Sequence, residues 1–171
     1  MKEIFLKNGF SKFSKFVDKE EIEKIRLIYD QILDDIEGTA HLRSDLSGKG
    51  DIGEEKITQI MCPSNLSKTL KKSKAYKKAL THAQHLLGED MSLDFDMLIN
   101  KKPYTDTPTP PHQDAAYWIK MPDKRAVSYW IAIDKATKKN GCMWFIPKKK
   151  NEIKPHHAAI TGAALSCEVS K

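Results

Sequence analysis

The 171-residue chain contains little cysteine and no long apolar run. Its three cysteines, Cys62, Cys142 and Cys167, are an odd number without close spacing, which argues against a disulfide framework and a zinc site. No apolar stretch approaches the length of a membrane span. The first eight residues carry a charge every few positions instead of the apolar region of a secretory signal. We therefore expect a cytoplasmic protein that does not associate with membranes.

The composition is that of one soluble globular domain spanning residues 1–171, with 40% hydrophobic and 30% charged residues. The formal net charge is +6, and most of the excess comes from lysines in 68–78 and 148–150. Such runs can attract nucleic acid or an anionic substrate. Aromatic residues that would stack on bases do not interleave with them. We therefore expect a solvated helix face and an exposed loop, with no nucleic-acid partner.

Residues 10–88 are expected to form a helical N-terminal part. The sequence Asp-Lys-Glu-Glu at 18–21 has the form of a capping box, and apolar residues at spacings of three and four predict an amphipathic helix that ends near Gly38. A second helix is predicted over 66–87. Between them, residues 41–53 are rich in Gly, Ser and Asp without periodicity and indicate a surface loop.

The rest of the chain has the alternating pattern of strands. Short strands are predicted at 56–60, 92–100, 126–134 and 142–147, and Asn140-Gly141 is a strong hairpin signal between the last two. Antiparallel strands joined in this way predict a mainly β fold with flanking helices. We expect a double-stranded β-helix, the cupin-like jelly roll, whose core begins at residue 92.

His112 and Asp114 are the candidate metal ligands. On an extended segment, residues two apart lie on one face and about 6.6 Å apart along the backbone, a gap that an imidazole and a carboxylate can close around one ion. Non-haem iron oxygenases hold iron with two His and one carboxylate, leaving open positions for co-substrate and O₂. The prolines of segment 103–111 restrict the backbone immediately before this pair.

The context of the pair resembles a known family. The order MLINKKP, TPPHQDAAYW, AVSYWIAIDKATKKNGCMWFIP and KPH is similar to that of the phytanoyl-CoA dioxygenase family, most densely over 97–155. The resemblance implies an Fe(II)- and 2-oxoglutarate-dependent dioxygenase that uses O₂ to hydroxylate a small molecule. His112 and Asp114 would be its metal-binding and catalytic residues. Related halogenases have a small residue in place of the carboxylate, so Asp114 favours hydroxylation.

The resemblance also implies three contacts to 2-oxoglutarate, at Gln59, Met97 and Trp130. Each has a purely structural alternative: Gln59 as an outward-facing polar residue of a strand, Met97 as core filling, and Trp130 as buried aromatic packing. The substrate itself is not specified by the sequence, although the lysines hint at an anionic group.

Two departures from the family pattern concern the C-terminal third. Family members have Pro-Gly-Ser/Thr-His where this chain has Pro147 followed by Lys148, Lys149 and Lys150. The later Pro-His step is kept, and we place its His156 on a loop at the substrate entrance. Residues 165–169 alternate like the family strand that leads to a distal His and a 2-oxoglutarate-binding Arg, neither of which follows in this sequence.

Two hypotheses therefore stand. The chain is a hydroxylase of this family, or it is a non-catalytic, C-terminally shortened member that keeps part of the fold without a complete iron site. On either hypothesis the jelly roll is expected to be incomplete at its C-terminal end.

Overall fold

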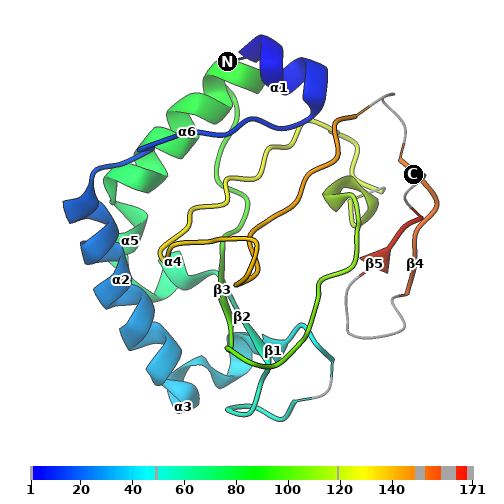
Figure 1. The fold of residues 1–171 in the computed structure, drawn as a ribbon. Helices are drawn as coiled ribbons and strands as arrows, with labels where there is room; N and C mark the ends of the chain where they lie inside the picture. The colour runs from blue at the N-terminus through cyan, green and yellow to red at the C-terminus, as the bar shows by residue number, and fades with distance from the viewer. Residues whose placement is uncertain (1, 49, 119, 149–152, 159–164, 169–171) are drawn as a thin grey trace.

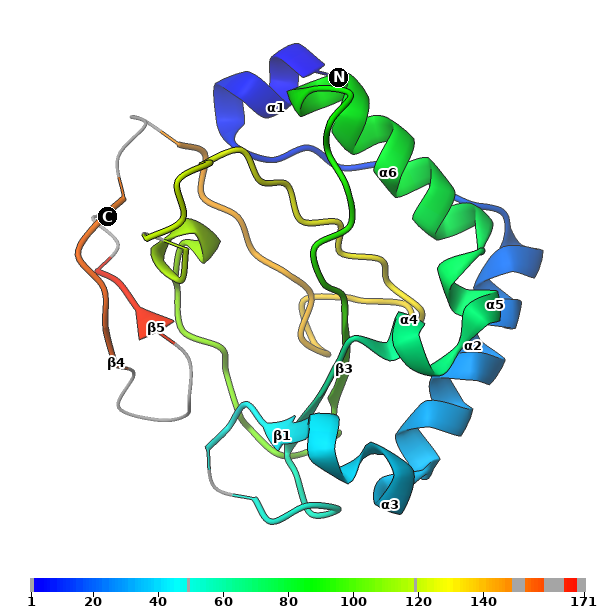
Figure 2. The ribbon, with the colours of Figure 1, turned by 180° about the vertical axis from the view of Figure 1, so that it is seen from behind.

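The computed structural model describes residues 2–48, 50–118, 120–148, 153–158 and 165–168. Its helices are α1 (Lys2–Asn8), α2 (Lys19–Asp34), α3 (Ile36–Thr39), η1 (Ala40–Leu42), α4 (Pro63–Leu66), α5 (Lys68–Lys71), α6 (Lys74–Leu87) and η2 (Asp114–Ala116). Its strands are β1 (Arg43–Asp45), β2 (Ile57–Met61), β3 (Met97–Lys101), β4 (His157–Ala158) and β5 (Leu165–Ser166). The long helices line one side of the molecule, and β4 and β5 lie on the opposite side (Figures 1 and 2).

Helix α2 begins as the sequence predicts. The carboxylate of Asp18 accepts a hydrogen bond of 2.8 Å from the N–H of Glu21, which confirms the N-cap. The carboxylate of Glu21, which is buried, instead accepts from the N–H groups of Lys74 and Ala75 at the start of α6. Helix α2 ends at Asp34, earlier than predicted, because Asp35 caps the short helix that follows.

The single helix predicted over 66–87 is wrong, since the structure divides this region into α4, α5 and α6. Ser67 and Ser73 have extended backbones, and their hydroxyls accept from the N–H groups of Leu70 and Tyr76. A serine that caps a new helix ends the preceding one. Gly88, at φ +132°, follows the last turn of α6 as predicted.

Strands β1, β2 and β3 form an antiparallel sheet in that order. Ile60 pairs with Leu98 on the buried face, where both pack against Ile32 of α2. On the open face Gln59 pairs with Ile99. The predicted strand at 56–60 is confirmed, whereas the one predicted from residue 92 begins only at Met97. The loop predicted over 41–53 is also corrected, because it starts with part of η1 and with β1.

Segments 126–134 and 142–147 do not form strands, so the predicted hairpin is absent as a hydrogen-bonded ladder. A turn is present: Asn140 Oδ1 accepts from the N–H of Thr137, and the N–H of Cys142 donates to the Thr137 carbonyl at 3.0 Å. The second segment instead adjoins the N-terminal region. The Phe145 ring stacks on Phe10 with centroids 5.0 Å apart, and Lys148 N–H donates to the carbonyl of Asn8.

Burial nevertheless alternates along residues 126–133. The partly buried side chains at odd positions face the helices: Ile131 and Ile133 pack against Ile25, Leu70 and Ala75. Even positions are exposed. The segment therefore has one buried and one exposed face, as a strand does. The jelly roll as a whole stays a prediction.

The second sheet pairs β4 with β5, which confirms a strand at the start of 165–169; Val169 lies outside the described residues, as do Lys149 and Lys150. Within the described ranges no helix is long and apolar enough to cross a membrane.

Candidate metal centre

The His-x-Asp segment lies between the helical layer and the β4–β5 sheet (Figure 1). Gln113 is extended, with φ −116° and ψ 121°, and the chain then turns into η2, where the N–H of Tyr117 donates to the carbonyl of Asp114 at 3.0 Å. The prediction that both ligands occupy one extended segment is thus wrong for Asp114, which is the first residue of the η2 turn. The extended residue between the ligands still directs their side chains to one side.

The two side chains converge. Nε2 of His112 lies 3.4 Å from Oδ1 of Asp114. Nδ1 of His112 lies 2.9 Å from the carbonyl oxygen of Pro110. A carbonyl can only accept, so Nδ1 carries a hydrogen and the neutral ring keeps its lone pair on Nε2. Metal-binding histidines are commonly fixed in this way by a hydrogen bond from the other ring nitrogen.

Each of the two side chains stabilises the charged form of the other. When the ring is protonated, Nε2 also carries a hydrogen and can donate to the Asp114 carboxylate, which raises the pKa of His112 above its usual value, although partial burial acts in the opposite direction. Pairing with the protonated His112 ring lowers the pKa of Asp114, against the effect of burial, and a hydrogen bond of 3.2 Å from the Ser128 hydroxyl lowers it further. Asp114 is therefore ionised at neutral pH, as a metal ligand must be.

The donor set fits a divalent metal. Metal bonds to imidazole nitrogen and carboxylate oxygen are about 2.1 Å long, which places two neighbouring donors about 3 Å apart. The observed 3.4 Å needs only a small side-chain adjustment. Among the residues that the structure describes, no group of three or more His, Cys, Asp or Glu side chains is placed to hold a metal ion, so His112 and Asp114 stand as a pair of candidate ligands without a third beside them in the described ranges.

The three residues expected near 2-oxoglutarate lie on exposed faces. The amide Nε2 of Gln59 contacts Sδ of Met97 at 2.7 Å on the open face of the β1–β3 sheet, and the hydroxyl of Ser44 donates to Gln59 Oε1. Met97 is 44% and Trp130 50% exposed, so neither fills a core. Trp130 shares the even-numbered face of its segment with Ser128, which contacts Asp114.

Ser128 was not predicted from the sequence; its hydroxyl donates to Asp114 from a segment fourteen positions further along the chain. The period-two pattern of 126–133 could have placed Ser128 on the face of Trp130, but it gives no information on which residue that face meets. His156, which we placed at the substrate entrance, contacts the segment of the candidate ligands: its Nε2 accepts from the N–H of Gln113 at 2.9 Å, a contact that no pattern in the sequence indicates.

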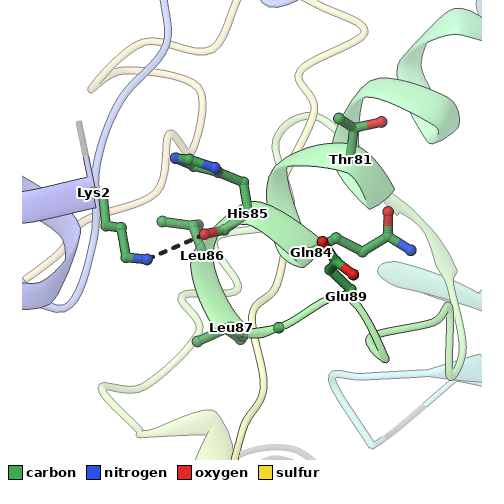
Figure 3. Close-up of a pocket in the computed structure, with 8 residues that line it drawn as sticks. Lys2, Thr81, Gln84, His85, Leu86, Leu87 and Glu89 are labelled. Carbon is green, nitrogen blue, oxygen red and sulfur yellow. Dashed lines mark hydrogen bonds between the residues drawn. The ribbon is translucent and has the colours of Figure 1, made fainter.

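A separate depression of about 750 Å³ lies at the C-terminal end of α6 (Figure 3). Lys2 reaches across it to donate to the carbonyl of His85 at 3.2 Å. None of the candidate site residues lines it. It is therefore distinct from the His112–Asp114 pair.

Comparison with known proteins identifies the class. Residues 5–166 match the family model of phytanoyl-CoA dioxygenase (PhyH). The chain therefore belongs to the PhyH family, as the resemblance predicted.

Individual relatives agree. One relative is phytanoyl-CoA dioxygenase domain-containing protein 1 of Danio rerio, to which the chain is 39% identical over 56 residues. This match covers 33% of the chain and 19% of the relative. The Bos taurus protein of the same name is 43% identical to the chain over 51 residues, a match that covers 30% of the chain and 18% of the relative. The chain is 25% identical over 164 residues to the peroxisomal phytanoyl-CoA dioxygenase of Homo sapiens, covering 91% of this chain and 48% of the human protein.

The matches thus span about half of the human relative and about a fifth of the others. No solved structure matches the chain significantly.

Proposed function

We propose that the chain carries the iron-binding segment of an Fe(II)- and 2-oxoglutarate-dependent dioxygenase that hydroxylates a small organic substrate on a cupin-like jelly roll. The observation that carries the proposal is the convergence of His112 Nε2 and Asp114 Oδ1 at 3.4 Å, with Nδ1 of the same ring engaged by a carbonyl. Family membership supports it, because the family is typically Fe(II)- and 2-oxoglutarate-dependent.

In this proposal each residue has a defined task. His112 and Asp114 bind the ferrous ion, Pro110 holds the imidazole in one tautomer through its carbonyl, and Ser128 holds the carboxylate. Iron and 2-oxoglutarate, when bound, supply the oxidation of an unactivated carbon and the decarboxylation of the co-substrate to succinate.

The half-buried amide of Gln59, with Met97 beside it, and the exposed indole of Trp130 are the proposed contacts to 2-oxoglutarate. They offer one hydrogen-bonding group and two apolar surfaces to a small dicarboxylate. Apolar surface lining a site excludes water from the reacting groups. An anionic group on the substrate remains part of the proposal through the basic character of the chain.

The competing function is a non-catalytic family member that keeps part of the fold without a complete iron site. It is favoured by the finding that the described residues bring together two ligands and no third. The two functions differ in one direct observable, the binding of Fe(II) together with 2-oxoglutarate.

Anaerobic titration of the metal-free chain with Fe(II) and 2-oxoglutarate is the test. A dioxygenase develops the visible charge-transfer band of chelated Fe(II), and His112→Ala and Asp114→Ala each weaken metal binding by more than about a hundredfold, beyond the usual effect of residues behind the ligands. His157→Ala, an exposed histidine outside the pair, is the matched control. A wild-type chain that shows no band and no metal binding would contradict the proposal and favour the non-catalytic member.

A further inference from the structure

Gln113, the residue between the two proposed ligands, is held by two hydrogen bonds to one short segment. Its backbone N–H donates to Nε2 of His156 at 2.9 Å. Its side-chain Oε1 accepts from the N–H of Lys154 at 2.7 Å. Backbone and side chain of the same residue therefore meet positions 154 and 156, which lie more than forty residues further along the chain.

His156 is itself fixed in one tautomer. Its Nδ1 lies 2.6 Å from the carbonyl oxygen of Lys154, so Nδ1 carries the hydrogen in that contact. Nε2 of the neutral ring is then an acceptor, which is what the N–H of Gln113 requires. Both ring nitrogens are used, and the ring cannot rotate without losing two hydrogen bonds.

We propose that His156 is a positioning residue for the metal-ligand pair, acting through the backbone of Gln113. This inference rests on the proposed function, because it assigns a purpose to the orientation of His112 and Asp114. The lone pair of Nε2 points at a peptide N–H, so His156 is not the third ligand in this arrangement.

The physical reason lies in the geometry of an extended residue. The side chains on either side of Gln113 leave the backbone on the face opposite its own side chain. A rotation of the Gln113 peptide therefore moves both ligands together. A third hydrogen bond, from the N–H of Cys167 to the carbonyl of Pro111 at 2.9 Å, fixes the backbone just before His112. Metal sites need their ligands held close to the productive geometry by such supporting contacts.

The experiment compares His156→Phe, which keeps a ring but removes the acceptor, with His156→Gln, whose side-chain carbonyl can again accept from Gln113. His157→Phe is the matched control, since His157 is the exposed neighbour on β4. Gln113→Leu removes the contact to Lys154 and gives an independent test should His156→Phe fail to fold. The two readouts are hydrogen exchange of the Gln113 amide by NMR and the affinity for Mn(II), a redox-inactive divalent probe.

We expect faster exchange of the Gln113 amide in His156→Phe and a Mn(II) affinity about tenfold lower, in the range found for residues that orient metal ligands. His156→Gln should restore most of the slow amide exchange and most of the Mn(II) affinity. Gln113→Leu should lower the Mn(II) affinity by a similar factor. His157→Phe should change neither the amide exchange nor the Mn(II) affinity. Mn(II) affinity within twofold of wild type in both His156→Phe and Gln113→Leu would overturn the inference.

The two proposals fail differently. If the wild-type chain binds no Mn(II) or Fe(II), the proposed function is contradicted, and amide exchange alone then decides whether His156 holds Gln113. If the wild-type chain binds metal while the Gln113 amide exchanges at the same rate in wild type and His156→Phe, the proposed function survives and the role of His156 is refuted.

Discussion

The hydroxyl of Ser128 donates to Oδ2 of Asp114 at 3.2 Å, while His112 faces the other oxygen of the same carboxylate. Both oxygens are thus engaged, one by the proposed partner ligand and one by a residue fourteen positions away. A carboxylate oriented from both sides has little freedom to rotate, which favours one mode of metal binding.

Replacing Ser128 by alanine should weaken the site without removing a ligand. The pKa of Asp114 is expected to rise toward its ordinary value, because one of the hydrogen bonds that lower it is lost. Mn(II) affinity should fall about tenfold. Ser92→Ala, at an exposed serine before β3, is the control for loss of a hydroxyl. Equal Mn(II) affinity in wild type and Ser128→Ala would show that the contact does not orient the carboxylate.

Metal binding should weaken as the pH falls through the raised pKa of His112. The metal needs the lone pair on Nε2, and a proton competes for it. Because the pKa of His112 lies above its usual 6.5, the loss of affinity should begin above that pH. Mn(II) titrations between pH 5.5 and 8.5, roughly spanning the range in which histidines change charge, measure this.

The metal-free protein gives the control for this pH dependence. An NMR titration of His112 in Asp114→Asn should show its pKa shifted back toward the ordinary value, since Asp114 is the largest cause of the rise. A pKa that is unchanged by this substitution would mean that another group raises it.

Asp45 should make the free energy of unfolding depend on pH in the acid range. Burial acts to raise the pKa of Asp45, but hydrogen bonds from the hydroxyl and N–H of Ser47 and from the N–H of Ile57 lower it to about 2. A lowered pKa contributes stability that is complete above the unfolded value of 3.8 and is lost as the pH falls toward about 2.

The Asp45→Asn variant should therefore be less stable at pH 7 by about 1–3 kcal/mol, because buried donors lose a charged acceptor. Urea unfolding at several pH values should show the difference from wild type shrinking below pH 3.8. Asp51→Asn, at an exposed position of the same loop, should have little effect. A constant difference across the acid range would contradict the assignment.

Replacing one partner of the buried ion pair between Arg43 and Glu55 should destabilise the protein strongly. Nε and Oε1 lie 2.8 Å apart, with side chains only 4% and 1% exposed. Arg43→Met should lower the free energy of unfolding by about 3–5 kcal/mol, because it leaves an unpaired buried carboxylate.

The double variant Arg43→Met/Glu55→Leu should lose less than the sum of its single variants in urea unfolding. Lys24 and Glu20 form an exposed pair at 2.7 Å, and breaking it should have little effect on the free energy of unfolding, because water screens the two charges. Additive losses at the buried pair would show that the two charges are not coupled.

What the sequence could predict was local. The cap at Asp18, strand β2, the stop at Gly88 and the convergence of the His112 and Asp114 side chains all depend on residues a few positions apart. The failures have tertiary causes. Phe145 stacks on Phe10 rather than belonging to a hairpin strand, and Ser128 reaches Asp114 only through the path of the folded chain. Neither contact leaves a periodic signal in the sequence.

Helix α6 shows a subtler failure. Its apolar pattern continues back to residue 66, so periodicity alone favours one helix, while the serine hydroxyls that divide it could equally have faced solvent.

The alternation of burial along 126–133 has a practical consequence for a library that varies this segment. Odd positions, packed on the helices, would be selected for expression and thermal resistance, whereas even positions, which include Ser128 and Trp130, would under the proposed function be selected for metal binding and catalysis. Engineers could thus recode every second codon of this segment to vary the proposed site while leaving the packed positions unchanged.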